Sequence, residues 1–251
     1  MGTAGSGGGV GSGSGGGGTK GGASESGSVW LRPPRPARAE PPLSRDRIVT
    51  AAVALLDDEG MDRLTMRRLA ERLGAGATTL YWHVETKDDV LDLAFDAIFG
   101  EAPLPGHHPG DDGWRHDVVA LLTGCREMLL RHPWSGALPL RRGPSMGPNF
   151  LGWLEYLQST LVRAGFRGQA VQAACWVLYN HVQCSTASQS SLHWPEDERL
   201  AARERLRADE GRYPTLVAGD YVLDDGWEEN FRLGLGYVLD GLQARLAADR
   251  P

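Results

Sequence analysis

The sequence predicts an all-α protein, and three observations support this fold class. Apolar residues recur three and four positions apart in several windows, which is the spacing of one face of a helix. Serine or threonine precedes the early windows and glycine follows them, as expected at helix ends. No segment shows sustained alternation of apolar and polar residues between turn signals, so no strand is predicted. With 251 residues and 41% hydrophobic content, the chain can bury a large core.

Charge and cysteine content narrow the functional classes. The formal net charge is −6, so no overall positive field attracts the chain to nucleic acid or acidic lipid, and any such binding must be local. Three cysteines without CxxC spacing argue against a disulfide framework and against a zinc site. No apolar run is long enough for a membrane helix, and the N-terminus lacks the apolar core of a signal peptide. We therefore expect a cytoplasmic protein with no membrane partner.

Residues 1–43 are predicted to lie outside the folded part of the chain. Their first part is dominated by glycine, so it cannot bury enough apolar surface to offset the entropy of ordering. The following part is rich in proline and arginine and is expected to be extended. Such an arm is usually a solvated linker, although it could also follow DNA phosphates or enter a minor groove.

Three short helices are predicted next. Ser44 can cap the first, which Gly60 ends. Thr65 can cap a short second helix, and a tight turn containing glycine then leads into a third helix that runs from Ala77 through Trp82. Three helices in a short span, the last two joined by a tight turn, indicate a helix-turn-helix unit. In such units the last of these helices enters the major groove of DNA.

The third helix carries an unusual number of hydrogen-bonding side chains. Leu80 can face the small core, which turns Thr78 and Thr79 outward. Hydroxyl groups suit phosphate oxygens, and threonine methyls suit the methyl group of thymine. Trp82 is expected in the core, because large rings near a turn are usually buried. The predicted DNA-contacting residues are Thr65, Arg67, Ala77, Thr78, Thr79, Tyr81, His83 and Lys87.

Acidic residues in the same region must be segregated from such a surface. Asp57, Asp58 and Glu59 are expected to form a solvated cluster at the end of the first helix, facing away from DNA. Thr86 can open a capping box for a fourth helix that ends near Gly100. This helix joins the DNA-reading unit to the rest of the chain, so a shift at its far end could tilt that unit.

Helical patterns continue after a loop rich in proline and glycine. The last of them carries a leucine-rich stripe beside glycines, which suits close packing against another helix. With the helix around residues 176–188 it is the candidate dimer interface, and packing within one chain is the alternative. The predicted helices cover residues 114–131, 149–164, 168–188, 196–209 and 226–248.

Aromatic residues with polar neighbours suggest a pocket in this second region. A small-molecule site needs an apolar cavity with a few polar groups. The candidates are Trp153, Trp176, Asn180 and Gln183, and the aromatic ones could equally belong to the core. The chain is thus predicted to hold a helix-turn-helix domain with its linker helix over 44–100 and a larger helical domain for ligand binding and dimerisation over 101–251.

The segment IVTAAVALLDDEGMDRLTMRRLAERLGAGATTLYWHVETKDDVLDLAFDAI resembles the N-terminal domain of the tetracycline repressor family. LTMRRLAERLG and LYWHVETKDDVLD resemble that family's second-helix motif and its third-to-fourth-helix motif. GRYPTL and FRLGLGYVLDGLQARL resemble C-terminal segments of its tetracycline-repressor branch. The resemblance implies a homodimer that represses transcription from a double-stranded, palindromic DNA operator and releases it when a small-molecule inducer occupies the C-terminal domain. It also implies that the fourth helix transmits the signal.

Three positions depart from the pattern of that family. Ala77 stands where tetracycline repressors present a glutamine that reads a base edge, which implies a different operator sequence. Pro103 falls near the position of the family's drug-contacting histidine, and Pro139 near that of its magnesium-binding histidine. We therefore expect an inducer other than tetracycline, and neither a metal nor a cofactor.

Two other functions are compatible with a helical chain of this kind. One is a helical small-molecule-binding protein that does not bind DNA. The other is an all-α metalloenzyme built on His107, His108, Asp111 and Asp112, since imidazoles and carboxylates can bind a transition metal. Against the enzyme, all four lie in one loop rich in glycine and proline, with no rigid element to orient them.

Overall fold

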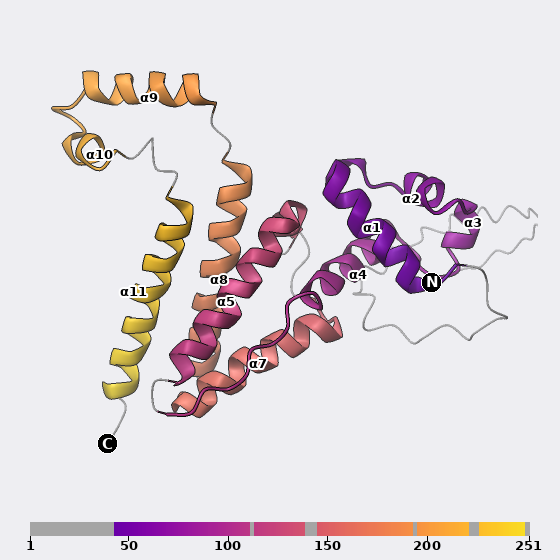
Figure 1. Cartoon of the computed structure of the whole chain (residues 1–251), viewed down its shortest axis with the longest axis horizontal. Coiled ribbons are helices and arrows are strands. Elements are labelled where there is room, and N and C mark those ends of the chain that lie inside the picture. Colours follow the sequence, from indigo (N-terminus) through magenta and orange to yellow (C-terminus); the bar gives the residue numbers. More distant parts are fainter. Residues whose placement is uncertain (1–42, 111–112, 139–144, 193–194, 221–225, 249–251) are drawn as a thin grey trace, which may run out of the picture.

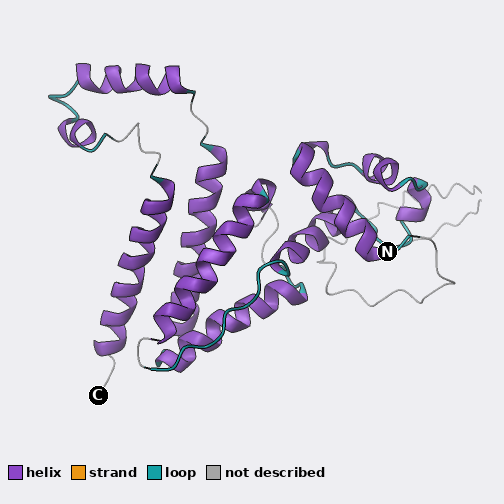
Figure 2. Cartoon of the chain, in the orientation of Figure 1, coloured by secondary structure: helices purple, strands orange, loops and turns teal. Residues whose placement is uncertain are grey.

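A computed structural model describes residues 43–110, 113–138, 145–192, 195–220 and 226–248 (Figure 1). Within these ranges every regular element is a helix, and Figure 2 shows no strand there, which confirms the all-α prediction. The elements are α1 (Arg45–Glu59), η2 (Met61–Arg63), α2 (Met66–Leu73), α3 (Ala77–Leu80), α4 (Lys87–Phe99), α5 (Gly113–Arg131), η3 (Pro133–Ala137), α7 (Pro148–Ala164), α8 (Gln169–Ser191), α9 (Glu196–Ala208), α10 (Pro214–Ala218) and α11 (Trp227–Ala248).

Residues 43–84, which we call the head, fold α1, α2 and α3 around a small apolar core. Ser44 and Thr65 cap α1 and α2 as predicted, because each side-chain oxygen accepts the main-chain N–H three residues later, at 3.2 and 3.1 Å. Gly60 and Gly74 follow the two helices with φ of 77° and 62°, a conformation that glycine adopts without steric cost. The buried side chains of the head are Leu43, Ile48, Ala52, Leu55, Leu56, Leu64, Leu69, Ala70, Leu80 and Val84.

The third helix is shorter than predicted. The helix α3 has 4 residues, and beyond it the chain tightens into turns in which the N–H of Trp82 donates to Thr79 O at 3.3 Å and that of His83 to Leu80 O at 3.0 Å. The prediction of a helix through Trp82 was therefore wrong. Its ring is 57% exposed, so the prediction that it lies in the core was wrong as well. Leu80 and Val84 occupy the core, and Trp82 lies between them on the outer side.

The long helix α4 joins the head to the rest of the chain. Thr86 and Asp89 form the predicted capping box, in which Thr86 Oγ1 accepts the N–H of Asp89 at 3.0 Å and Asp89 Oδ2 accepts the N–H of Thr86 at 3.1 Å. The helix packs against α1 of the head and against α7 of the second domain. Its Phe99 ring meets that of Phe150 edge-on, with centroids 5.1 Å apart. The helix α4 therefore contributes to the core of the head and to that of the second domain.

Within residues 101–248, α8 packs against α5, α7 and α11 (Figure 1). The five helices predicted here are confirmed as α5, α7, α8, α9 and α11, each within three residues of its predicted ends. The short elements η3 and α10 were not predicted, because five residues are too few to show helical periodicity. None of the helices formed by the described residues combines the length and apolar character that a membrane crossing requires.

Asp96 of α4 joins that helix to the start of α7. The position before Pro148 is Gly147, which has no side chain with which to cap α7. Asp96 takes this role: it is buried, and its Oδ1 accepts the N–H of Phe150 at 2.9 Å while Oδ2 accepts Nδ2 of Asn149 at 3.0 Å. Burial raises the pKa of Asp96, and these hydrogen bonds oppose the rise. Glycine is needed at 147 because a Cβ there would overlap the Asp96 carboxylate.

Candidate DNA interface and ligand core

The end of the head remote from α11 is formed by α2, α3 and the turn between them (Figure 1). Left-handed Gly74 and then Gly76, the residue before α3, reverse the chain tightly so that α3 packs against α2. The structure brings the predicted residues of α3 together at this end. Ala77 and Thr78 are exposed, and Thr79 is half-buried.

Two aromatic rings extend this surface beyond α3. Tyr81 is 46% exposed, and the neighbouring Trp82 is the residue that sequence reasoning missed. Trp82 is exposed because Leu80 and Val84 fill the small core of the head, which the sequence pattern alone does not show. The surface thus offers hydroxyl groups, a methyl group and aromatic rings, which can hydrogen bond to phosphates and pack on sugars or bases.

The predicted flanking residues take on structural roles as well. The Thr65 hydroxyl already caps α2, and the exposed guanidinium of Arg67 pairs with Glu71, at 2.9 Å between Nε and Oε1. Lys87 Nζ donates to the main-chain oxygen of Met61 at 3.0 Å, which ties the start of α4 to the head. An ammonium group has two further protons to donate, so this bond still leaves Lys87 able to reach a phosphate.

His83, the remaining predicted contact, is half-buried. Its Nε2 is inaccessible to solvent and finds no hydrogen-bond partner among the described residues. A buried ring nitrogen of this kind is uncommon in native proteins. His83 therefore borders the surface formed by α2 and α3 with one edge of its ring turned inward.

Asp57 and Asp58 are exposed to solvent as predicted, but the acidic residues at the end of α1 each bind a different partner and so do not act as one free cluster. Asp58 pairs with Arg72 at 2.6 Å and Glu59 with Arg68 at 2.5 Å, so both carboxylates are held within the head. Asp57 instead contacts the C-terminal domain. The physical reason is that the cations of α2 lie within reach of α1, which a count of charges along the chain does not show.

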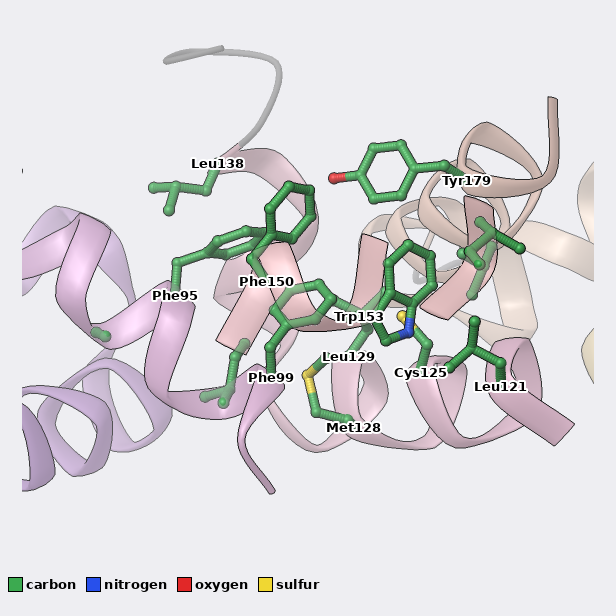
Figure 3. Close-up of a cluster of buried hydrophobic side chains, with 14 of the residues drawn as sticks. Phe95, Phe99, Leu121, Cys125, Met128, Leu129, Leu138, Phe150, Trp153 and Tyr179 are labelled. Atoms are coloured by element: carbon green, nitrogen blue, oxygen red, sulfur yellow. The ribbon is translucent and has the colours of Figure 1, made fainter. Parts of the chain in front are cut away.

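The interior of the C-terminal domain is an aromatic cluster (Figure 3). Trp153 is 2% exposed and packs against Phe99 and Tyr179 at centroid distances of 5.8 and 6.0 Å. Its Nε1 has no hydrogen-bond partner among the described residues, although it is buried. Burial raises the pKa of Tyr179, which keeps this phenol neutral. An indole N–H without a partner is a polar group that a ligand could satisfy.

Gln183 is the second buried polar group in this interior. Its Nε2 donates to the main-chain oxygen of Gly136 at 3.3 Å, while its Oε1 is buried without a partner in the described part of the chain. The other two predicted pocket residues lie elsewhere: Trp176 is 54% exposed and Asn180 is exposed, both on the outer face of α8. Within one chain, then, the structure separates Trp153 and Gln183 from Trp176 and Asn180.

A groove of about 500 Å³ lies between α5 and α11. Two ion pairs join these helices, Arg115 to Asp240 and Arg126 to Glu228, each at 2.6 Å. No feature of the sequence pointed to this groove. Its apolar lining is formed by Val119, Phe231, Leu235 and Leu239.

The paired histidines of the loop before α5 bind a carboxylate of the same chain. His108 donates to Oδ1 of buried Asp117 from its main-chain N–H at 3.0 Å, and its Nδ1 lies 2.8 Å from that oxygen. Burial alone would raise the pKa of Asp117, but the hydrogen bonds from His108 and His107 outweigh it and lower the pKa. The other two members of the proposed metal quartet, Asp111 and Asp112, lie outside the described residues, as do Pro139 and the N-terminal arm.

Comparisons with known proteins match both parts of the chain. The family model described as "Bacterial regulatory proteins, tetR family" matches residues 48–94. The model described as "Tetracyclin repressor-like, C-terminal domain" matches residues 104–246. The first range covers the head from residue 48 onward and the first part of α4, and the second covers the chain from residue 104 to residue 246 in α11.

Individual relatives and solved structures extend these matches. An HTH-type transcriptional regulator of Saccharopolyspora erythraea is 45% identical over 221 residues, which are 87% of this chain and 92% of that protein. ActR of Streptomyces coelicolor in complex with actinorhodin is similar with a TM-score of 0.72 and 31% identity, covering 82% of this chain and 97% of ActR. BioQ with its double-stranded DNA operator is similar with a TM-score of 0.58 and 26% identity, covering 80% of this chain and 99% of BioQ.

Proposed function

This chain belongs to the tetracycline-repressor family of bacterial transcriptional regulators, and from that premise we propose that it is a ligand-responsive repressor. In this proposal a homodimer binds a palindromic DNA operator and leaves it when a small-molecule inducer occupies the C-terminal domain. Family membership supports the general function.

The observation that carries the DNA-binding proposal is the polar and aromatic surface at the outer end of the head. Thr78 and Tyr81 lie there beside Trp82, with Arg67 and Lys87 at its edges. The arginine and the lysine supply affinity that depends on salt, whereas the side chains of α3 and the residues after it read the groove. BioQ, which is similar to this chain over most of its length, has been solved with its operator.

The base sequence that this surface prefers should differ from that of tetracycline operators. Ala77 cannot form the paired hydrogen bonds by which a glutamine reads adenine. A methyl group packs instead against the methyl group of thymine. We therefore expect the contact at the start of α3 to be a thymine methyl group rather than a base edge held by paired hydrogen bonds.

Exposed apolar stripes on α8 and α11 support a homodimer. On α8, Trp176 and Val177 are 54% and 48% exposed, and on α11 Leu233 and Tyr237 are 38% and 71% exposed. The two helices pack against each other, and in this proposal their exposed apolar residues pair with those of a second copy. A symmetric pair would present two heads about 34 Å apart, which is one turn of DNA and requires a palindromic site.

The inducer is proposed to enter the aromatic interior beside Trp153 and Gln183. Both side chains are buried and each has one polar atom without a partner in the described part of the chain. A flat aromatic molecule with hydrogen-bonding groups would satisfy both atoms and stack on the neighbouring rings. The similar ActR has been solved with actinorhodin. Pro103 offers no imidazole at the position of the drug-contacting histidine, so magnesium-bound tetracycline is not the expected ligand.

The test begins with selection of bound DNA from a random pool, using the full chain. We expect a palindromic sequence to be enriched, and Tyr81→Ala to weaken binding to it by about 1 to 3 kcal/mol in a gel-shift titration. Tyr213→Ala, the same change outside the head, serves as the matched control and should leave binding unchanged. A small-molecule screen for release from the selected DNA then identifies the inducer.

Two results of that selection would contradict the proposal in different ways. If no DNA sequence is enriched, the chain is a helical ligand-binding protein without an operator. If a sequence is enriched but Tyr81→Ala and Tyr213→Ala bind it alike, the surface at the end of the head is not the contact region. DNA binding stands if a sequence is enriched, and the proposed contact surface stands only if the two variants also differ.

A further inference from the structure

One carboxylate of the head is held by the C-terminal domain. Asp57 lies in the last turn of α1, and its Oδ1 accepts the indole N–H of Trp134 at 2.7 Å. Nδ1 of His132 lies 2.8 Å from the same oxygen. His132 and Trp134 are 7% and 6% exposed. Charge-assisted hydrogen bonds made by buried donors are among the stronger polar contacts in proteins.

The same histidine also reaches the end of α4. Its Nε2 lies 3.0 Å from Oε2 of Glu101, a carboxylate that also pairs with Arg131 at 3.3 Å. One imidazole thus bridges the last turn of α1 and Glu101, the second residue after α4.

The segment that carries these donors is fixed to the interior of its own domain. Ser135 is fully buried and donates through Oγ to the main-chain oxygen of His132 at 2.7 Å. Gln183 of α8 donates to Gly136 O, and a Cβ at Gly136 would lie only 3.2 Å from the Cβ of Ala187. The element η3 therefore lies directly on α8. Because of this packing, His132 and Trp134 stay fixed to the C-terminal domain if the head moves.

Neighbouring acidic residues show that this contact is specific to Asp57. Asp58 pairs with Arg72 inside the head and makes no contact of this kind with η3. Charge on α1 alone therefore does not explain why η3 and α1 meet. The contact needs a carboxylate on the one face of α1 that meets the segment after α5.

We infer that His132 and Trp134 are positioning residues that fix the orientation of the head through Asp57. They do not touch DNA. By holding α1 against η3 they set the direction in which α3 faces. The head is then already in one orientation before it binds DNA, so it loses little orientational freedom on binding. Only the DNA readout of this role rests on the proposed function.

The first test measures the head without DNA. Spin labels are placed at Thr50→Cys on α1 and Leu151→Cys on α7, both exposed, in a Cys184→Ser background that leaves the buried Cys125 and Cys175 in place. We expect Asp57→Ala and Trp134→Phe to broaden the distance distribution between the labels. Asp58→Ala removes the same charge from the next residue and should leave the distribution as it is in the parent protein.

The second test measures binding to the selected operator by fluorescence anisotropy. Asp57→Ala and Asp58→Ala each remove one negative charge from the head, so their electrostatic effect on DNA affinity is alike. We expect Asp57→Ala to bind about tenfold more weakly than Asp58→Ala, because its head must be ordered on binding. Trp134→Phe keeps most of the ring volume and should show a similar loss, and the double variant should lose less than the sum of the two.

The two measurements separate the possible failures. Unchanged distances in both Asp57→Ala and Trp134→Phe would overturn the inference, whatever the DNA results. Broadened distances with no operator for the parent protein would support the positioning role and reject the repressor. Additive losses in the double variant would show that Asp57 and Trp134 act separately, against the inference. Melting temperatures close to that of the parent confirm that each variant is folded.

Discussion

The carboxylate of Asp96 on α4 caps α7 by accepting the main-chain N–H of Phe150 at 2.9 Å. We expect Asp96→Ala to lower the free energy of unfolding by about 2 kcal/mol, because it removes the cap of α7 and leaves buried donors without a partner. Asp96→Asn keeps an oxygen that can cap the helix, so it should lose less. Urea unfolding monitored by circular dichroism measures both. Equal stability of the alanine variant and the parent would show that the cap contributes nothing.

Two glycines next to and within α7 should respond in opposite ways to alanine. Gly147 has an ordinary φ of −72°, but its missing Cβ makes room for the Asp96 carboxylate, so Gly147→Ala should destabilise the protein by about 1 to 3 kcal/mol. Gly152 has no heavy atom within 4 Å of an added Cβ. Gly152→Ala should stabilise by up to about 1 kcal/mol through helix propensity. Thermal melts of the two variants side by side check the signs: a Gly147→Ala variant as stable as the parent would refute the account of Gly147, and a loss in Gly152→Ala would refute that of Gly152.

The stability contributed by Asp117 should depend on pH. Its pKa is lowered in the folded protein, so the unfolded chain binds the proton more tightly and stability rises with pH through this group. The contribution is complete above the ordinary value of 3.8 and is lost as pH falls through the lower, folded pKa. We expect Asp117→Asn to lower the free energy of unfolding by about 1 to 3 kcal/mol above pH 3.8, and by progressively less below that pH.

Asp240→Asn is the control for that experiment. Asp240 pairs with Arg115, but its side chain is 71% exposed, and exposed pairs contribute about 0 to 1 kcal/mol. Urea titrations at several pH values compare the two variants with the parent. If Asp117→Asn lowers the free energy of unfolding by the same amount at every pH, the lowered pKa of Asp117 in the folded protein is contradicted.

The exposed stripes of α8 and α11 predict a dimer that one charge can weaken. Tyr237 is 71% exposed in the single chain, and Tyr237→Glu would bury a carboxylate in the proposed interface. We expect the dissociation constant of the dimer to rise about tenfold or more, as for the loss of an interface hot spot of about 2 kcal/mol. Sedimentation velocity over a concentration series measures it. Val162→Glu, at an exposed apolar residue of α7, should leave the dimer intact.

Local capping was predictable because the atoms involved lie within a few residues of one another. Ser44, Thr65 and Thr86 each bond a main-chain N–H three residues ahead, so sequence alone could place these helix starts. The partner of Asp57 lies 75 residues away, and the cap of α7 comes from a different helix. Contacts between distant segments leave no periodic signal in the chain.

The candidate site was predictable to a similar degree. Exposure of Ala77 and Thr78 followed from a buried Leu80, but the exposure of Trp82 depended on which side chains fill a small core. The helix α8 is apolar on two faces, with Leu178 inside and Trp176 outside. Periodicity could not decide which face meets the interior, and so the predicted pocket residues include both.

The shared core around α4 has a consequence for dissecting this protein. A fragment that begins after Phe99 would lack two phenylalanine rings of its own interior and the carboxylate that starts α7. The C-terminal domain is therefore not expected to fold by itself when the chain is cut at the end of α4. A truncation meant to isolate it has to retain α4, whose N-terminal half would then present apolar side chains that α1 normally covers.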